Sequence, residues 1–538
     1  MRRSGHALIL VVCLLLAIAH TWPLALHPGR YSRNDNADTQ LNEWILAWIE
    51  HQLPRDPAHL FEANIFYPAH DSLAFSEPLI VPALMGAPVA WLGGSPVLVY
   101  NFVLIAGFAL TVFATSVLVE AWTGSWLAGL IAGSLFAFNT HTLTRLSHIQ
   151  GIHLYALPIA LLAVDRIVRD ERRYRAALLL AASLAVMAYT SGYLIVFAAV
   201  MLAVSTVTRV PDWWPRVRRA LPPILLAGAV ASLAILPVYL PYRRVARDQH
   251  MVRTLDAVRD FSATPTGYLA TAGRLHFATW SGRFFKDPVD AFFPGFTILA
   301  LALVALIAAM RRRDADVTLR RRATMLVAIG ATGFVLSLGV ATPVYGWMFR
   351  VFPPMQGLRA AARFGNLFLL AVAVLGGIGA AHISRSKRWV AVILLALVNI
   401  ESLSAPFTYT PFAGIPDAYG LLAREPGRVV VAEQPFFPRS AIFQNGPYVL
   451  ASTANWRPLM NGYSGYTPEG YQHYADAFWY FPEKSAIEAM KNSGVTHVVV
   501  HPSGFPGGHG VDISSLDGRP DFELMAIGRD VRLYRLKR

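Results

Sequence analysis

Apolar runs long enough to cross a lipid bilayer recur along this chain from Ala7 to Ser404. A helix needs about 20 residues to cross a hydrocarbon core of roughly 30 Å. The composition agrees, because the 538 residues are 55% hydrophobic and 15% charged, whereas about a quarter of the residues in a soluble domain are charged. The runs lie near residues 7–28, 96–119, 125–140, 152–168, 174–190, 192–208, 220–240, 291–310, 323–340, 364–383 and 388–404. We therefore expect a polytopic α-helical membrane protein with about eleven spans.

One further apolar segment, residues 78–94, is shorter and more interrupted than the others. Its sequence, PLIVPALMGAPVAWLGG, contains Pro82, Gly86 and Pro88. If this segment crossed the bilayer, the arginines at residues 166–175 would lie on the outer side, against the usual distribution of basic residues. We interpret it as a re-entrant or interface-lying helix, and a tilted twelfth span is the alternative.

The basic residues set the expected orientation. Arginines cluster near residues 166–175, 209–219, 311–322 and 385–388, and short basic loops face the cytoplasm. The amino terminus is then cytoplasmic, and everything after Ser404 is extracytoplasmic. The net charge of +14 reflects this topology, so we expect no nucleic acid as a partner. The basic, apolar start also fits a signal peptide cleaved after Ala19, but we interpret it as a retained helix because many spans follow.

The expected domain organisation follows from these spans. Residues 1–404 form a membrane domain, whose first outer loop, residues 29–95, contains interfacial helices. Residues 405–538 form a soluble, extracytoplasmic α/β domain. Its strands are predicted in four apolar, β-branched segments, residues 428–434, 448–452, 496–502 and 531–537. Its helix is predicted at residues 482–494.

The first outer loop places acidic residues beside tryptophans. From Asp38 onward the apolar residues recur at helical spacing, and those on one face are Leu41, Trp44, Ile45 and Trp48. Tryptophan prefers the headgroup level of a bilayer, so we expect this helix to lie flat on the membrane surface. Asp38 then either caps the start of the helix or acts as a functional acid, with Asn42 one turn further on the same side.

Other polar residues are predicted on the same outer side as Asp38. Glu77 closes the first outer loop, and His148, Gln150 and Tyr193 lie in the short connections that follow. An acid near the bilayer tends to be functional when it faces a cavity. A carboxylate here can act as a general base on a hydroxyl group while a phosphate departs, a reaction that also needs positive charge near the phosphate.

Arginines are suited to hold that phosphate, because the guanidinium group matches phosphate oxygens with two parallel hydrogen bonds. Arg359 and Arg363 precede a span at positions i and i+4, so one helix face can present both. Arg145 and Arg243 are weaker candidates for the same role. The alternative for each is an arginine that snorkels to the membrane interface.

Two further patterns have both a structural and a functional interpretation. Trp456, Tyr463 and Tyr466 belong to an aromatic-rich stretch of the tail, where such rings either bind sugars or form the core of a small domain. The glycine cluster LGGIGAA, beginning at Leu375, lies in an apolar run without a preceding strand, so we interpret it as a close helix contact rather than a dinucleotide site.

Four segments carry a family resemblance. They are NADTQLNEWILAW, ANIFYPAHDSLAFSEP, LSHIQGIHLYALPIALL and PLMNGYSGYTPEGY. They resemble bacterial membrane proteins assigned to the GT-C superfamily of glycosyltransferases, and the resemblance covers the spans and the tail. It implies a catalytic acid in the first outer loop. Members often have Gly-Asp at this point and this chain has Ala37-Asp38, so the resemblance implies Asp38 as the catalytic acid, with Glu77 as a second contributor.

The resemblance also implies a reaction and its partners. An inverting transferase of the bacterial inner membrane would move a sugar from a polyprenyl-phosphate carrier to a glycan, lipid or protein acceptor of the cell envelope, such as a polysaccharide. Some superfamily members need a divalent metal, but this chain lacks a convincing ligand set, and its single cysteine, Cys13, excludes a cysteine-based site. The alternatives are a flippase or transporter of lipid-linked sugars, and a non-catalytic scaffold in envelope assembly.

Overall fold

The computed structural model describes residues 3–33, 35–251, 253–311, 317–505 and 513–537. The chain forms two compact units. Unit 1 comprises Met1–His27, Asn101–Leu240 and Met251–Thr408, and unit 2 comprises Pro28–Tyr100, Pro241–His250 and Tyr409–Arg538. The predicted first outer loop and the C-terminal segment therefore belong to the same compact unit. The division into a membrane domain and an outer domain stays a prediction, and part of the arginine-rich segment near residues 311–322 lies outside the described residues.

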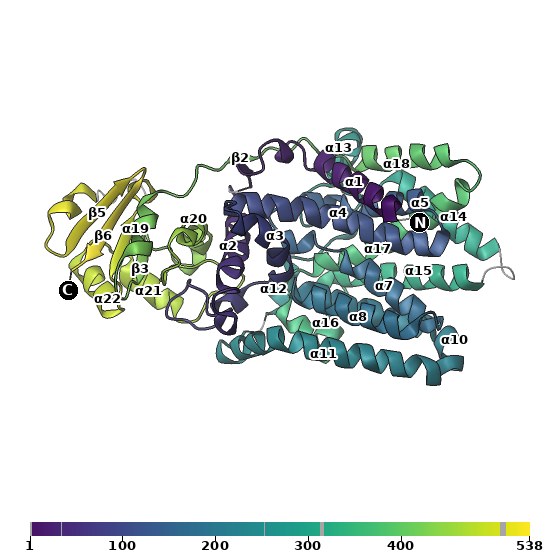
Figure 1. Ribbon diagram of the computed structural model, residues 1–538, viewed down its shortest axis with the longest axis horizontal. Helices are drawn as coiled ribbons and strands as arrows, with labels where there is room; N and C mark the ends of the chain where they lie inside the picture. Colours follow the sequence, from purple (N-terminus) through teal and green to yellow (C-terminus); the bar gives the residue numbers. More distant parts are fainter. Residues whose placement is uncertain (1–2, 34, 252, 312–316, 506–512, 538) are drawn as a thin grey trace. The chain divides into compact units, whose positions relative to one another are not determined.

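A helix coincides with every apolar run predicted from the sequence (Figure 1). These helices are α1 (Arg3–His20), α4 (Pro96–Thr123), α5 (Trp126–Ala137), α7 (Ala156–Val168), α8 (Arg173–Ala188), α9 (Gly192–Thr208), α11 (Val217–Asp248), α14 (Phe296–Arg311), α15 (Val317–Ser337), α17 (Gly365–Ile383) and α18 (Arg388–Ser402). Shorter helices connect them, namely α6 (Thr140–Leu143), α10 (Val210–Trp213), α12 (Leu255–Arg259), α13 (Arg274–Thr279) and α16 (Pro343–Val351). The described part of unit 1 is therefore built from helices, as expected.

Four helical segments of the described chain are long and apolar enough to cross a membrane: Pro96–Thr123, Ile149–Val168, Val210–Asp248 and Ala361–Ile383. Five further apolar helices are shorter, with 10–17 residues each. The count of eleven spans and the orientation of the termini therefore stay predictions. The segment at 78–94 contains α3 (Ile80–Trp91), whose 12 residues extend over roughly 18 Å; whether this segment crosses the membrane also stays a prediction.

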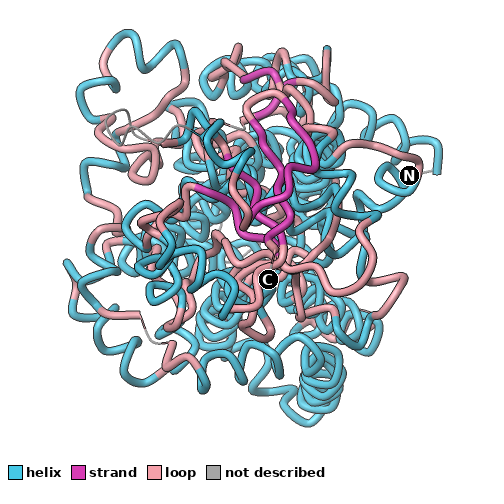
Figure 2. The backbone as a smooth tube through the Cα atoms, turned by 90° about the vertical axis from the view of Figure 1, so that its left-hand side faces the viewer, coloured by secondary structure: helices cyan, strands magenta, loops and turns pink. Residues whose placement is uncertain are grey.

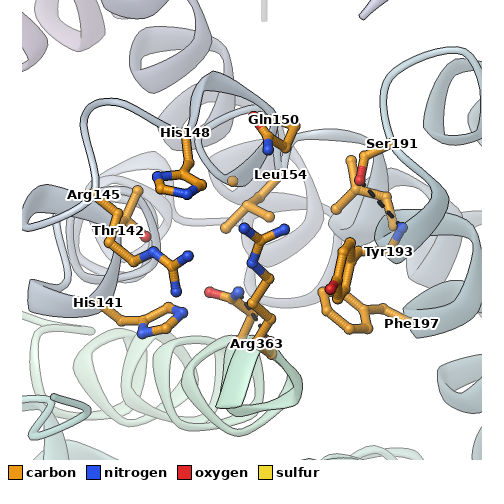
Figure 3. Close-up of a pocket in the computed structure, with 13 residues that line it drawn as sticks. His141, Thr142, Arg145, His148, Gln150, Leu154, Ser191, Tyr193, Phe197 and Arg363 are labelled. Carbon is orange, nitrogen blue, oxygen red and sulfur yellow. Dashed lines mark hydrogen bonds between the residues drawn. The ribbon is translucent and has the colours of Figure 1, made fainter. Parts of the chain in front are cut away.

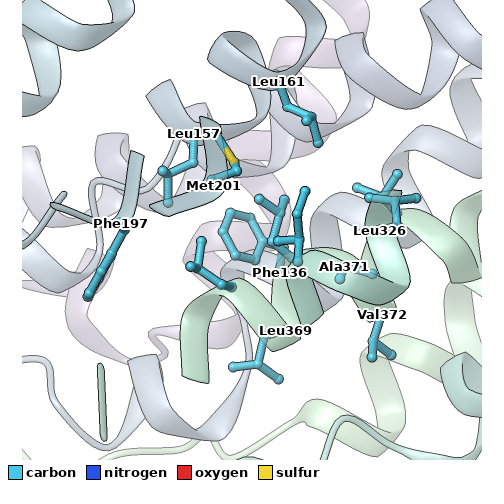
Figure 4. Close-up of a cluster of buried hydrophobic side chains, with 14 of the residues drawn as sticks. Phe136, Leu157, Leu161, Phe197, Met201, Leu326, Leu369, Ala371 and Val372 are labelled. Carbon is cyan, nitrogen blue, oxygen red and sulfur yellow. The ribbon is translucent and has the colours of Figure 1, made fainter. Parts of the chain in front are cut away.

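Helix α17 lies at the centre of unit 1, against α5, α14 and α15. Its apolar residues Leu369, Ala371 and Val372 belong to a buried cluster that also includes Phe136 of α5 and Leu326 of α15 (Figure 4). Burial of this apolar surface and close packing hold the helices together.

The glycine cluster of α17 permits these close contacts. A Cβ atom on Gly379 would lie 1.8 Å from the carbonyl oxygen of Leu301 in α14, and one on Gly376 would lie 2.3 Å from Cδ1 of Ile298. A Cβ atom on Gly377 would lie 2.9 Å from that of Ala132 in α5. The interpretation of LGGIGAA as a close helix contact is confirmed.

We expect Gly379→Ala to destabilise the protein by about 1–3 kcal/mol, because the added methyl group forces α14 and α17 apart. The thermal unfolding midpoint of the purified protein measures the effect. Gly228→Ala is the matched control, since a Cβ atom there meets nothing within 4 Å and alanine favours a helix. Equal midpoints for the two variants would contradict this role of Gly379.

Unit 2 contains all the strands of the described chain (magenta in Figure 2), and they form two separate sheets. A two-stranded pair joins β1 (Tyr31–Ser32) to β2 (Thr410–Pro411). The larger sheet has the order β3-β4-β6-β5, with β3 parallel to β4 and the other neighbours antiparallel. Its strands are β3 (Val431–Gln434), β4 (His497–Val500), β5 (Phe522–Gly528) and β6 (Val531–Leu536).

The helices of unit 2 are α2 (Ala37–Gln52), α3, α19 (Ala418–Arg424), α20 (Gly446–Ala451), α21 (Tyr471–Phe478) and α22 (Lys484–Asn492). The predicted helix at 482–494 is confirmed as α22, and three of the four predicted strands are confirmed as β3, β4 and β6. The strand predicted at 448–452 is wrong, because Pro447 in the first turn of α20 favours a helix start. Strand β5 was not expected.

Candidate functional site

Five of the residues predicted as site residues line one cavity in unit 1 (Figure 3). They are Arg145, His148, Gln150, Tyr193 and Arg363. They come from the connection between α6 and α7, from the first turn of α9, and from a short helical turn, η10 (Ala361–Phe364), that leads into α17. The guanidinium groups of Arg145 and Arg363 both point into the cavity.

Local capping interactions fix the segments that carry these side chains. Asn139 caps α6, and its Oδ1 accepts hydrogen bonds from the backbone N–H of Thr142 at 3.0 Å and from its hydroxyl at 3.1 Å. At the start of α9, the Ser191 hydroxyl accepts a hydrogen bond from the Tyr193 N–H at 3.1 Å. The two caps fix the starts of α6 and α9, and so they hold Thr142 and Tyr193 at the cavity.

Tyr193 holds the arginine segment in place. The guanidinium carbon of Arg363 lies 4.4 Å from the centre of the Tyr193 ring, a distance at which the ring attracts the cation. The Tyr193 hydroxyl oxygen accepts hydrogen bonds from the N–H groups of Arg359 at 3.1 Å and Ala360 at 3.0 Å. Tyr193 therefore orients Arg363 by its ring and by its hydroxyl.

The positive charge of the cavity comes from its arginines. Burial, and then the charges of Arg145 and Arg363, hold the pKa values of His141 and His148 well below the ordinary range. Both imidazoles are therefore neutral at pH 7 and can each donate one hydrogen bond and accept another. An anion entering the cavity meets two guanidinium groups and no described carboxylate among the lining residues.

Two amide oxygens of the cavity have no hydrogen-bond partner among the described residues. They are Oε1 of Gln150 and Oδ1 of Asn366, and buried polar atoms of this kind are normally paired. They suit a ligand that brings hydroxyl donors. The space between the side chains is about 20 Å³, room for a water molecule, so a larger ligand requires the arginine side chains to move.

Two predicted arginines lie elsewhere. Arg359 is exposed and stacks over Phe261, with its guanidinium carbon 4.9 Å from the ring centre. The expectation that Arg359 and Arg363 share a helix face is wrong, because residues 358–360 are not helical. Arg243 lies exposed in unit 2, where its neighbour Arg244 makes two hydrogen bonds of 2.9 Å to Asp71.

The proposed catalytic acid, Asp38, lies in the first turn of α2 in unit 2. The side chain of Asn36 caps this helix by accepting a hydrogen bond from the Asp38 N–H at 2.9 Å. The capping interpretation of Asp38 is therefore wrong, and its carboxylate is used differently. Asp38 Oδ1 accepts a hydrogen bond from the Tyr463 hydroxyl at 2.6 Å, in the charge-assisted range.

The segment before Tyr463 is held firmly within unit 2. The buried side chain of Asn461 accepts a hydrogen bond from the Glu433 N–H at 2.8 Å and donates one to the Glu433 carbonyl at 3.1 Å. A Cβ atom on Gly462 would lie 2.5 Å from the ring of Phe66, so this approach requires glycine. These contacts fix the position of the segment, so that the Tyr463 hydroxyl reaches the Asp38 carboxylate.

We expect Tyr463→Phe to lower the stability of the protein by about 1.5–3 kcal/mol, because it removes a hydrogen bond to a charged group. Thermal unfolding measures the change. The control is Tyr466→Phe, which removes a hydrogen bond of 2.8 Å to an uncharged acceptor, the Gln249 carbonyl, and should cost about 0.5–1.5 kcal/mol. A larger loss of stability in Tyr466→Phe than in Tyr463→Phe would contradict a charge-assisted hydrogen bond between Tyr463 and Asp38.

The remaining predicted residues of unit 2 lie as follows. Asn42 is buried, and Glu77 is half-buried beside Ser76, whose carbonyl accepts a hydrogen bond from Tyr242. Trp456 is half-buried with His51 stacked on its ring at 4.4 Å, so that face is covered. The catalytic role of Glu77 and the substrate-binding roles of Asn42 and Trp456 stay predictions.

The tryptophans of α2 are not at a lipid surface. Trp44 and Trp48 are 1% and 5% exposed. The indole N–H of Trp44 donates to Oδ1 of Asn64 at 3.1 Å, and that of Trp48 donates to the Leu60 carbonyl at 2.9 Å. The expectation that they lie at the headgroups is wrong, because they fill the interior of unit 2.

Sequence reasoning missed His141, Ser191 and Asn366 of the cavity. His141 lies four residues before Arg145, and Asn366 lies three residues after Arg363, so helical spacing around each predicted arginine was the available signal. Within the described residues, no group of three or more His, Cys, Asp or Glu side chains can hold a metal ion.

Comparisons with known proteins identify the fold. No family model and no curated protein matches the sequence. Among solved structures, the arabinofuranosyltransferase AftD from Mycobacteria is 16% identical with a TM-score of 0.60, and the match covers 100% of this chain and 40% of AftD. ArnT from Cupriavidus metallidurans, bound to undecaprenyl phosphate, is 14% identical over 99% of this chain and 98% of that one, with a TM-score of 0.44. An oligosaccharyltransferase from Archaeoglobus fulgidus is 12% identical over 93% and 70%, with a TM-score of 0.49.

The chain thus spans 40% of the length of AftD. At this level of identity the similarity concerns the fold, and it agrees with the family resemblance of the four sequence segments. The chain has a fold similar to that of AftD, as the resemblance of the sequence segments implies.

Proposed function

We propose that this protein is an inverting glycosyltransferase of the bacterial inner membrane. It transfers a sugar from a polyprenyl-phosphate carrier to a hydroxyl group of a glycan, lipid or protein at the outer face of the membrane. The observation that carries the proposal is the cavity of unit 1. Arg145 and Arg363 point into it beside two neutral histidines.

The lining of this cavity matches a sugar phosphate. Phosphate oxygens accept hydrogen bonds from the guanidinium groups, and sugar hydroxyls donate to the unpaired oxygens of Gln150 and Asn366. A negatively charged group suits the two guanidinium groups that point into the cavity, and a ligand without hydroxyls would leave the amide oxygens unpaired. A phosphate-linked sugar satisfies both requirements.

The reaction divides into two tasks. Asp38 takes the proton of the acceptor hydroxyl, whose oxygen then attacks the anomeric carbon of the donor sugar. The bond between that carbon and the phosphate oxygen breaks, and the carrier leaves as polyprenyl phosphate with one additional negative charge. Arg145 and Arg363 stabilise this charge as it develops. Tyr193 keeps Arg363 oriented, and Tyr463 keeps the Asp38 carboxylate oriented.

A test uses the purified protein in lipid nanodiscs with radiolabelled polyprenyl-phosphate sugars. We expect acceptor-dependent release of polyprenyl phosphate and a glycosylated product. In cells that lack the protein, mass spectrometry should find the lipid-linked sugar accumulating and a surface glycan, glycolipid or glycoprotein missing that sugar. A transporter would instead leave donor and acceptor chemically unchanged in nanodiscs, and a scaffold would show no donor dependence; either result overturns the proposal.

A further inference from the structure

Unit 2 contains a second cavity, separate from the residues assigned above. Its volume is about 230 Å³, far more than the roughly 10–15 Å³ that one water molecule needs. Residues of α19, α20 and the segment after β4 line it, together with the turn between β5 and β6 and Gln40 of α2. All these segments belong to unit 2.

His501 and Tyr419 line the cavity, and both contact a buried acid, Glu433. Glu433 and Tyr419 are 1% and 2% exposed. Nε2 of His501 lies 2.7 Å from Glu433 Oε2, and the Tyr419 hydroxyl donates to the same oxygen at 3.1 Å. The ring of Tyr448 stacks on His501 at 4.6 Å. The imidazole is therefore fixed in position and orientation.

The hydrogen-bond pattern of His501 leaves one nitrogen for a ligand. Because the Glu433 carboxylate is an acceptor, Nε2 carries the hydrogen of this pair. Nδ1 makes no hydrogen bond with a described residue, and His501 lines the cavity. In the neutral ring, Nδ1 is an acceptor that matches a hydroxyl donor.

The rest of the lining combines apolar walls with polar groups that bear no net charge. Phe412, Pro416 and Leu450 supply apolar surface, and Gln40 supplies an amide. Arg529 and Asp530 carry opposite charges on the same turn, and Ser503 fixes Asp530 by donating its N–H at 2.9 Å. A small ligand that fits has apolar faces, several hydroxyls and no charge.

We propose that this cavity binds a neutral sugar ring of a glycan. A sugar ring has apolar C–H faces that pack on aromatic and proline surfaces, and its hydroxyls both donate and accept hydrogen bonds. A charged sugar or a peptide terminus would bring a charge that the cavity does not balance. Gln40 belongs to the same helix as Asp38, two residues further on. A role of the cavity in holding the acceptor rests on the proposed transfer reaction, whereas the binding of sugar does not.

The binding test uses the full-length protein in nanodiscs. The probes are glucose, galactose, mannose, arabinose and their disaccharides, with glucuronate and a triglycine peptide as comparisons, and saturation-transfer NMR measures their affinity. We expect at least one neutral saccharide to bind saturably. Ile415→Trp fills the cavity and His501→Gln removes Nδ1, and each should weaken binding about tenfold or more. Leu421→Trp is the matched control, because Leu421 is exposed on α19 and does not line the cavity.

The outcomes are distinct. Any one of three results overturns the proposal. The first is that no neutral saccharide binds. The second is equal binding in the Ile415→Trp protein with an unchanged unfolding midpoint, and the third is a preference for glucuronate or triglycine. Asp38→Asn should lower the rate of transfer by about 10²- to 10⁴-fold and keep saccharide binding. If Asp38→Asn retains transfer, the proposed catalytic role fails while the cavity is still judged by the binding data. In the transfer assay, Ile415→Trp should raise the KM for the acceptor and leave the KM for the donor unchanged.

Discussion

Replacing Asp38 with asparagine should lower the rate of sugar transfer by about 10²- to 10⁴-fold, the contribution of a positioned general base. The amide cannot take a proton from the acceptor hydroxyl, although it has nearly the same shape as the carboxylate and can still accept the Tyr463 hydrogen bond. The helix start should be unaffected, because Asn36 and not Asp38 provides the cap. Radiolabelled transfer in nanodiscs at saturating donor and acceptor measures the loss in kcat.

The control for this variant is Asp35→Asn. Asp35 is an exposed carboxylate three residues earlier, and its oxygen lies 3.2 Å from Nε of Arg33 in a surface ion pair. Such pairs contribute little, so its rate should stay within about twofold of the native protein. A fully active Asp38→Asn protein, inserted normally, would remove Asp38 from the reaction.

Replacing Arg145 or Arg363 with glutamine should weaken the use of the lipid donor. Each substitution removes a charge-assisted hydrogen bond of about 1.5–3 kcal/mol, so kcat/KM for the donor should fall by roughly 10- to 150-fold. Arg363→Lys should restore only part of the loss, because an ammonium group keeps the charge but not the planar pair of donors. Kinetics with varied donor concentration provide the measurement.

Arg359→Gln is the comparison for these variants. Arg359 is exposed and stacks on Phe261 outside the cavity, so its kcat/KM should change by no more than about twofold. If Arg359→Gln were as damaging as Arg363→Gln, the carrier phosphate would not lie in the cavity that Arg145 and Arg363 line.

The helices of this fold are predictable from the sequence for a physical reason. A chain in a bilayer must satisfy its backbone hydrogen bonds within each helix, so hydropathy alone marks the runs that coincide with the long helices of unit 1, such as α4 and α17. The small sheet is harder. Strand β5 has a register shift between Leu524 and Ala526, which breaks the alternation that predicts a strand. At 448–452, Pro447 outweighed the strand preference of tyrosine and valine.

The residues of the candidate site were predictable from the sequence in part, and their shared location was predictable only where they are close in the sequence. Arg145, His148 and Gln150 share one short connection, so their common location follows from local spacing. The hydrogen bond from Tyr463 to Asp38 joins residues 425 positions apart, and no local pattern specifies it. The two candidate caps of α2, Asn36 and Asp38, are two positions apart. This difference is within the usual uncertainty of helix boundaries, so the sequence does not decide between them.

The first loop and the carboxy-terminal segment pack against each other and together form the interior of unit 2. The Asn64 side chain accepts from Trp44 and donates to Ser452 and to the Arg457 carbonyl, and Tyr31 pairs with Pro411. A protein shortened after residue 404 would lose these partners and would expose the helix that carries Asp38. Exchange of tails between related enzymes should therefore succeed only when the loop is exchanged with the tail, and the two segments should diverge together in evolution.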